Sequence, residues 1–310
     1  MDIMPSSSGS SPRDAELAVE AIRSAESLSE LVGVLDADTV QDAYFEAKRV
    51  WREQTDGWFP TSYDGEGVLP GDRVVVNGHD FHVHGVTHAG TDEERGFLRD
   101  HVSRFLDRNA TVYCEQGMRR MYFDDFGAVC EMDDYGWSLQ KVKELGGGSS
   151  VSYEADEIER LRSRLRNSVF ALVEAGTGVY GDRFADALGD VASDFLTSKV
   201  DASKRSDFRS FRLTRKVAEN PERLSELQTY YRRHLLPHPL ERDWLSRYDT
   251  EIEIFTYGRN ERMADYAVYH NEDAEEVHLI VGAAHQPGVV HCLEGHRDGR
   301  RTIEEFQLFG

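Results

Sequence analysis

The sequence predicts an α/β protein with a mostly parallel sheet built from βαβ units, a helical amino-terminal segment and a large helical insertion. Three observations predict this class. A strand, a helix and a second strand follow one another between residues 80 and 114. A further buried strand follows a helix between residues 260 and 282. Helical periodicity fills most of the remaining chain, which at 310 residues is long enough for one large core with an inserted subdomain.

The first half of the α/β core is expected over residues 73–145. A β-branched run ends at Asn77-Gly78, a strong hairpin signal, and a second strand follows at residues 80–86. A capping-box pattern at Thr91 opens a helix, and residues 110–114 form the next strand. This crossover makes its two strands parallel, so their carboxyl ends lie at the edge where open α/β sheets bind ligands.

Periodicity and composition assign the other segments. The predicted units are a disordered Ser-rich tail at 1–12, amino-terminal helices and a loop at 13–72, a helical insertion at 151–240 and the second half of the core at 245–310. This second half should contain a helix at 260–270, a buried strand at 277–282 and a terminal strand at 302–309. Residues 249–255 fit a strand or a helix equally well.

Charge and cysteine content restrict the function classes. The chain has 57 Asp and Glu against 36 Lys and Arg, only six of them Lys, and a net charge of −21. Such a surface suits a cytosol with concentrated salt, which screens its self-repulsion, and it repels nucleic acid. No stretch approaches the roughly 20 apolar residues that span a bilayer. The three scattered Cys and the lack of an apolar leader favour a cytoplasmic protein.

Two Gly-x-x-His turns are the strongest functional signal. Gly85 to His88 and Gly282 to His285 each follow a predicted strand, and Glu115 follows a third. Glycine lets the backbone turn tightly or approach a ligand closely, so Gly85 and Gly282 are expected to contact a cofactor or substrate. A single such His is more often a satisfied polar residue at a strand end. Two copies with an acid after a third strand favour a functional site.

Glu115 needs a cationic partner because it ends an apolar strand. Arg119 and Arg120 follow closely, and either guanidinium could hold the carboxylate ionised or bind a substrate carboxylate.

These motifs resemble the TraB/PrgY/GumN family. The resemblance covers roughly residues 80–120 and 260–293, and its second half includes Asn260-Glu261-Arg262-Met263-Ala264 before the second Gly-x-x-His. That family is grouped with the TIKI proteins, the erythromycin esterases and the ChaN-like haem-iron proteins. The resemblance implies that His88, Glu115 and His285 form one polar site. It also implies that Arg120 and Arg262 are its paired arginines, with Arg119 as the alternative to Arg120.

The expected function is hydrolysis of a peptide or another small acyl substrate. His88, Glu115 and His285 could bind a divalent metal such as Mn, Co or Zn, which would activate water while an arginine stabilises the oxyanion. Without metal, a His or Glu115 would act directly as general base. The competing class is a module that binds a metal, haem or peptide without turnover, and a third reading is a regulator that has lost its chemistry.

His82 and His84 offer a different metal site. Their His-x-His spacing puts two imidazoles on one face of a strand, as in barrel amidohydrolases and PHP phosphoesterases. The chain has no eightfold strand–helix repeat and no later ligand cluster to complete such a site, so a role as pocket lining is preferred.

Overall fold

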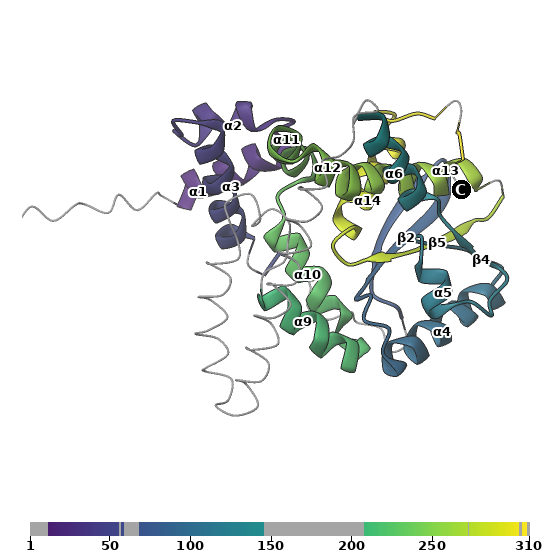
Figure 1. Cartoon of the computed structure of the whole chain (residues 1–310). Coiled ribbons are helices and arrows are strands. Elements are labelled where there is room, and N and C mark those ends of the chain that lie inside the picture. Colours follow the sequence, from purple (N-terminus) through teal and green to yellow (C-terminus); the bar gives the residue numbers. More distant parts are fainter. Residues whose placement is uncertain are drawn as a thin grey trace, which may run out of the picture.

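A computed structural model describes residues 12–55, 57–58, 68–145, 208–271, 273–303 and 306–308. In this part of the chain a five-stranded sheet has the order β1-β2-β5-β3-β4, with helices on both faces (Figure 1). β1 is antiparallel to β2, and the other pairings are parallel. The predicted fold class, an α/β protein with a mostly parallel sheet, is confirmed.

The strands of the sheet come from two separate parts of the chain, with β1 to β4 before the predicted insertion and β5 after it. The strands are β1 (Asp72–Val76), β2 (His79–Val86), β3 (Thr111–Cys114), β4 (Val129–Glu131) and β5 (Glu276–Gly282). The helices before the predicted insertion are α1 (Pro12–Ser24), α2 (Leu28–Val34), α3 (Val40–Gln54), α4 (Asp92–Asp107), α5 (Met118–Tyr122) and α6 (Asp134–Leu145). Those after it are α9 (Phe208–Glu219), η2 (Pro221–Arg223), α10 (Leu224–His234), α11 (His238–Tyr248), α12 (Thr250–Glu253), η3 (Ile254–Gly258), α13 (Arg259–His270) and α14 (Gln286–Arg297).

β5 occupies the middle of the sheet although it comes last in the chain. Leu279 lies opposite Val83 of β2 on one side and opposite Tyr113 of β3 on the other. The crossover from β2 through α4 to β3 therefore leaves a gap of one strand, which β5 fills from the far end of the sequence. Because β2, β5 and β3 are parallel, their carboxyl ends meet at one edge.

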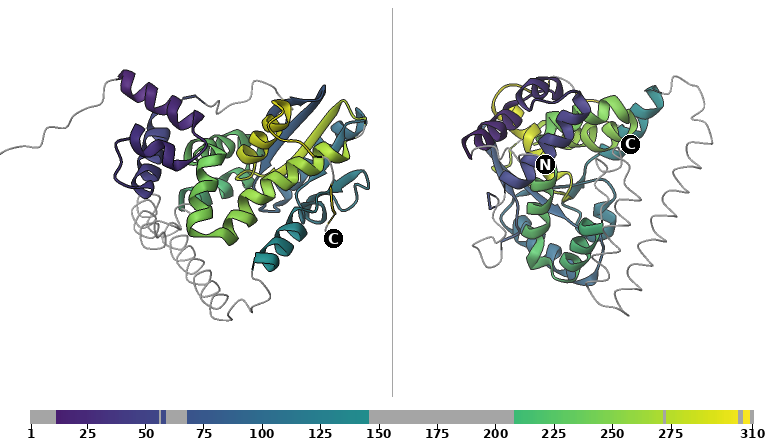
Figure 2. Two further views of the ribbon diagram at one scale, coloured as in Figure 1. Left: turned by 90° about the horizontal axis from the view of Figure 1, so that it is seen from above. Right: turned by 90° about the vertical axis from the view of Figure 1, so that its left-hand side faces the viewer.

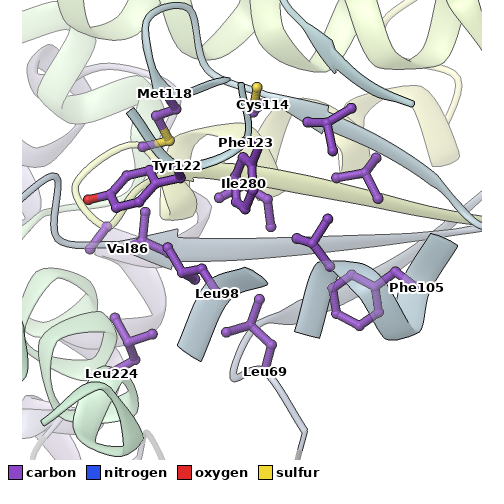
Figure 3. Packing of buried hydrophobic residues seen from close by; sticks show 14 of the residues in the cluster. Leu69, Val86, Leu98, Phe105, Cys114, Met118, Tyr122, Phe123, Leu224 and Ile280 are labelled. Carbon is purple, nitrogen blue, oxygen red and sulfur yellow. The ribbon is translucent and has the colours of Figure 1, made fainter. Parts of the chain in front are cut away.

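Apolar side chains alternate between the two faces of the sheet, as a buried sheet requires. On one face, Val86, Cys114 and Ile280 pack against helix residues such as Leu98 and Leu224 (Figure 3). On the other face, residues such as Val83, Tyr113 and Leu279 pack against α13 and α14. The sheet is thus covered on both sides, and its free polar surface lies at the strand ends.

The amino-terminal helices form a second apolar cluster with α11. Tyr44 of α3 stacks on Trp244 of α11 with ring centroids 4.1 Å apart. In both views of Figure 2 these purple helices lie against the green helices at one side of the molecule. Packing against α11 therefore joins residues 13–54 to the core.

Other boundary predictions differ from the structure in places. No strand occurs at the described residues of the predicted terminal strand, 302–303 and 306–308, where Phe306 instead packs on Arg262. The ambiguous segment 249–255 is helical. Asp249 caps the start of this helix, because its side chain accepts the Ile252 N–H. The described part of the predicted insertion, 208–240, is helical; residues 151–207 and nearly all of the predicted tail lie outside the described residues.

Among the described residues, no helix has both the length and the apolar composition needed to cross a membrane.

Candidate functional site

The structure brings His88, Glu115 and His285 together at the carboxyl edge of the sheet. These residues follow β2, β3 and β5, and β5 lies between the other two. His88 Nε2 lies 3.2 Å from Glu115 Oε2, and His285 Nε2 lies 3.8 Å from Glu115 Oε1. Three distant stretches of sequence thus meet around one carboxylate.

Glu115 is the buried centre of this cluster, with only 4% of its side chain exposed. Its Oε2 accepts the backbone N–H of Gly282 at 2.7 Å, and its Oε1 accepts Arg259 at 2.6 Å. Burial alone would raise the pKa of Glu115. The charge of His285, the hydrogen bond from His88 and the charge of Arg259 outweigh it and hold the pKa well below its ordinary value. Glu115 is therefore a carboxylate at neutral pH.

His88 is held in a strained conformation at the site. Its φ is +64°, a left-handed value that costs a non-glycine residue roughly 1–2 kcal/mol. Its side chain is 38% exposed, against 13% for His285, so it is the most accessible member of the cluster. Strain of this kind persists only where the surrounding structure fixes the loop.

Buried Glu94 and Tyr122 fix that loop. Thr91 caps α4 as predicted and accepts Glu94 N–H at 3.1 Å. The Glu94 carboxylate does not complete the expected capping box. It accepts Thr87 N–H at 2.9 Å and the Tyr122 hydroxyl at 2.7 Å, and Tyr122 in turn accepts Gly90 N–H. The Glu of the predicted helix start thus supports the turn that carries His88.

His285 is oriented by a fully buried amide. Its Nδ1 lies 2.7 Å from Oδ1 of Asn260, which has 0% exposure. When Asn260 accepts the Nδ1–H, Nε2 is the nitrogen that faces Glu115. Gly288 makes room for this arrangement, because a Cβ at that position would overlap the Asn260 amide.

Arg259 bridges two buried carboxylates. It binds Glu115, and its Nε donates to Asp134 Oδ2 at 2.8 Å. Burial raises the pKa of Asp134 to about 6, with the charge of Glu115 adding to the effect and Arg259 opposing it. Of the two acids, Glu115 is therefore ionised at neutral pH, whereas Asp134 titrates nearer neutrality. Such a difference in pKa is typical of sites that move protons.

A π-helical turn precedes Arg259 and sets its direction. The turn Ile254–Gly258 adds one residue to the helical register, and such insertions occur frequently at functional sites. Gly258 permits close packing there, because its Cβ would lie 3.0 Å from the Trp137 ring. The ring of Tyr135 lies 5.7 Å from the Arg259 guanidinium.

The arginines that the sequence predicted lie elsewhere. Arg262 donates to Asp133 at 2.8 and 2.6 Å and stacks on Phe306. Arg120 is exposed on α5, and Arg119 donates to the Val129 carbonyl at 2.9 Å. The guanidinium bound to Glu115 is that of Arg259, which the sequence reasoning missed.

Asn260 and Asp134 were missed as well. A signal existed for Arg259, since it lies three residues before Arg262 on one helix and Asp134 directly follows Asp133. Two arginines at helical spacing can each bind one of two neighbouring acids, and in the structure Arg259 binds Asp134 and Arg262 binds Asp133.

Gly85 and Gly282 let neighbouring groups approach the backbone closely, and neither residue forms the turn that follows its strand. Both belong to strands, and the left-handed residues of the first loop are His88 and Gly90. A Cβ on Gly282 would lie 2.5 Å from His88 Nε2, and one on Gly85 would lie 2.7 Å from the backbone of Ala283. Gly282 thus creates the space in which His88 reaches Glu115.

The donor set does not fit a divalent metal in this arrangement. Both oxygens of Glu115 already accept hydrogen bonds, and an ion bridging His285 and Oε1 would lie beside the Arg259 guanidinium. Across the described ranges, no group of three or more His, Cys, Asp or Glu side chains is placed to hold a metal ion.

His82 and His84 belong to a separate imidazole cluster beneath α4. His84 is buried between Pro70 and His278, with its Nδ1 3.0 Å from the Pro70 carbonyl and its Nε2 2.9 Å from His278 Nδ1. His278 stacks on Phe105 at 3.6 Å, and His82 stacks on His278 at 5.0 Å. His84 bonds to the Pro70 carbonyl and to His278, and His278 Nε2 lies 2.9 Å from Glu276 Oε1, as in a satisfied core cluster.

This cluster should make the fold acid-sensitive. Burial, aided by the charge of His82, lowers the pKa of His278 to about 4. Between about pH 6.5 and that value the unfolded chain binds more protons, so the free energy of unfolding should fall by about 2–3 kcal/mol as the pH falls. Denaturant unfolding across this range should show the loss in wild type and a shallower slope in His278→Leu. His79→Gln, at the partly exposed start of β2, is the control, and an equal slope in all three proteins would contradict the prediction.

Gly282→Ala should separate His88 from Glu115 without unfolding the protein. The new methyl group would meet the mobile end of His88, whereas the methyl group of Gly85→Ala would meet the Ala283 backbone. We therefore expect a change in His88 imidazole NMR signals with a small loss of stability in Gly282→Ala. Gly85→Ala should lose more stability, about 1–3 kcal/mol. Unchanged His88 signals in Gly282→Ala would show that the contact is not made.

The motifs of the chain are the basis for its resemblance to other proteins. Of the residues that carry the TraB/PrgY/GumN resemblance, the structure groups His88, Glu115 and His285, and it places Asn260 against His285. Comparison of the chain with models of known protein families and with curated protein sequences found no match.

Proposed function

We propose that this protein is a hydrolase of small acyl compounds, esters or peptides, in which His88 is the general base and Glu115 orients it. The observation that carries the proposal is the contact between the exposed, strained imidazole of His88 and the buried, ionised carboxylate of Glu115. Strained residues beside perturbed ionisable groups are typical of catalytic sites.

The pKa of Glu115 decides which group is the base. A carboxylate whose pKa lies well below its ordinary value is a poor proton acceptor, so Glu115 acts by position and charge. It accepts the Nε2–H of His88, which leaves the lone pair on Nδ1. It also stabilises the imidazolium that forms when Nδ1 takes a proton, as the Asp of a Ser-His-Asp triad does.

The reaction follows from this assignment. His88 Nδ1 removes a proton from water while the water oxygen bonds to the acyl carbon. The tetrahedral intermediate then expels the alcohol or amine, which takes the proton from His88. Arg259 and the Gly282 N–H keep Glu115 ionised throughout. His285 is the second imidazole that faces Glu115, and it lies beside the acyl group in this reaction.

The family resemblance supports the same chemistry. Among the groups linked to TraB/PrgY/GumN proteins, the TIKI proteins are metal-dependent proteases, whereas the erythromycin esterases attack an ester without an obvious metal. Because the donor set around Glu115 does not fit a metal, the second mode is the one proposed.

A hydrolysis screen tests the proposal. The full chain, in concentrated KCl, would be assayed against p-nitrophenyl esters and peptide libraries, before and after treatment with a chelator. We expect turnover that survives chelation and is lost in His285→Ala. Turnover that needs an added metal would replace the general-base mechanism, and a stable complex with peptide but no turnover would favour a binding module.

A further inference from the structure

A pocket lies between the amino-terminal helices and the core. It has a volume of about 470 Å³, within the range of small-molecule sites. Its larger apolar lining side chains are Trp51, Leu235, Leu236, Tyr257 and Val290. We call it the Trp51 pocket; His88, Glu115 and Arg259 are not among its lining residues.

The apolar lining is closely packed and already formed. Trp51, Leu235, Leu236 and Tyr257 are each at most 6% exposed, and the Trp51 indole N–H donates to the Arg232 carbonyl at 3.0 Å. A preformed apolar floor costs little ordering when an apolar group binds. The body of a fitting ligand is therefore hydrocarbon.

The charged groups at the rim differ in how firmly they are paired. Arg232 binds Asp72, which also accepts Gln286 at 2.8 Å, so this acid is already neutralised. Arg23 is 54% exposed, and its carboxylate neighbour Glu20 lies 3.8 Å away. A loosely paired guanidinium is well suited to bind a carboxylate with two parallel hydrogen bonds.

The acid at the rim does not reverse this preference. Glu294 also lines the pocket, and Arg297 lies 3.6 Å from its Oε1, so a ligand carboxylate would sit on the Arg23 side of the opening. The net charge of −21 disfavours anions at long range, so direct contact with the Arg23 guanidinium supplies the preference for an anionic headgroup over a cationic one.

The pocket wall also supports the Glu115 site. Ala284, Pro287 and Gly288 line the pocket on either side of His285. Gly288 packs against Asn260, the amide that orients His285. A ligand in the pocket would therefore change the surroundings of the His285 imidazole.

We propose that the Trp51 pocket binds small amphipathic carboxylates, with the hydrocarbon on its apolar floor and the carboxylate on Arg23. The site is separate from the one assigned to hydrolysis, and the inference does not rest on that function.

Titration calorimetry with octanoate, octanol and octylamine tests the proposal on the full chain. Octanoate should bind about threefold or more tightly than octanol, the range expected of one partly exposed ion contact, and octylamine should bind least. Arg23→Gln should remove the preference for octanoate and leave octanol binding intact. Val290→Trp, which fills the pocket, should abolish both, whereas Val34→Trp at an exposed position should bind as wild type does.

Two further measurements keep the outcome clear. Octanoate should shift the Trp51 indole N–H signal of the wild-type protein, which does not depend on any variant folding. His88→Ala should bind octanoate unchanged, so failure of the hydrolase proposal would leave this one standing. Absence of binding, binding that Val290→Trp does not affect while Trp51 stays unshifted, or a preference for octylamine would each overturn it.

Discussion

His88→Ala should lower the rate of acyl hydrolysis by about 10²- to 10⁴-fold, the usual contribution of a general base. The imidazole is the accessible group of the site, and its Nε2 is fixed by Glu115. The loss should appear in kcat more than in KM, because the base acts on the transition state. A variant that keeps the wild-type rate would remove His88 from the mechanism.

The strain at the same position can be measured through stability. His88→Gly and His88→Ala both lose the contact with Glu115, but only glycine relieves the φ of +64°, so His88→Gly should have the higher free energy of unfolding by about 1 kcal/mol. Asn109→Gly is the matched control, since Asn109 has a φ of +62° in a turn remote from the catalytic edge. It should alter stability without altering turnover. A His88→Gly protein no more stable than His88→Ala would show that His88 is not strained.

Glu115→Gln should destabilise the fold by about 1–3 kcal/mol and abolish turnover. The substitution keeps the shape of the side chain but removes one of the two carboxylates that compensate buried Arg259, and Asp134 remains. Denaturant unfolding would measure the loss. The control is Glu46→Gln at the partly exposed Arg49 ion pair, which should cost about 1 kcal/mol or less.

A double variant separates charge from packing in this prediction. Arg259→Gln combined with Glu115→Gln removes both charges. The double variant should therefore lose less unfolding free energy than the sum of the losses in the two single variants. If the two losses simply add, Glu115 and Arg259 are not coupled and the buried ion pair does not organise the site.

Much of the fold could be predicted because local signals agreed with the tertiary structure. Asn77-Gly78 marks the β1–β2 hairpin, and both residues have positive φ as that turn requires. Thr91 caps α4, and the apolar run at Val277–Val281 is buried throughout, as a central parallel strand must be.

The convergence of the two Gly-x-x-His turns could also be expected, since both follow parallel strands. The sequence contains no local signal for the position of β5 between β2 and β3, because strand order depends on packing between distant segments. That position determines how closely His88 and His285 approach Glu115.

The supporting residues were harder to find. Whether Arg259 or Arg262 reaches Glu115 depends on the rotation of α13, and the π-helical turn before it shifts that rotation. Asn260 opens the motif of residues 260–264 but acts through His285, and Asp134, which acts through Arg259, belongs to no motif. The alternating pattern at 302–309 predicted a strand, but Phe306 packs on Arg262 and the described residues there pair with no sheet edge.

The orientation of His88 by Glu115 is most directly tested by ¹⁵N NMR of imidazole-labelled protein at neutral pH. If the buried carboxylate accepts a hydrogen bond from His88, the resonances will report a ring protonated at Nε2 and unprotonated at Nδ1, and Glu115→Gln will abolish that bias. A His88 ring protonated at Nδ1, or one whose tautomers are equally populated with and without Glu115, would contradict the account.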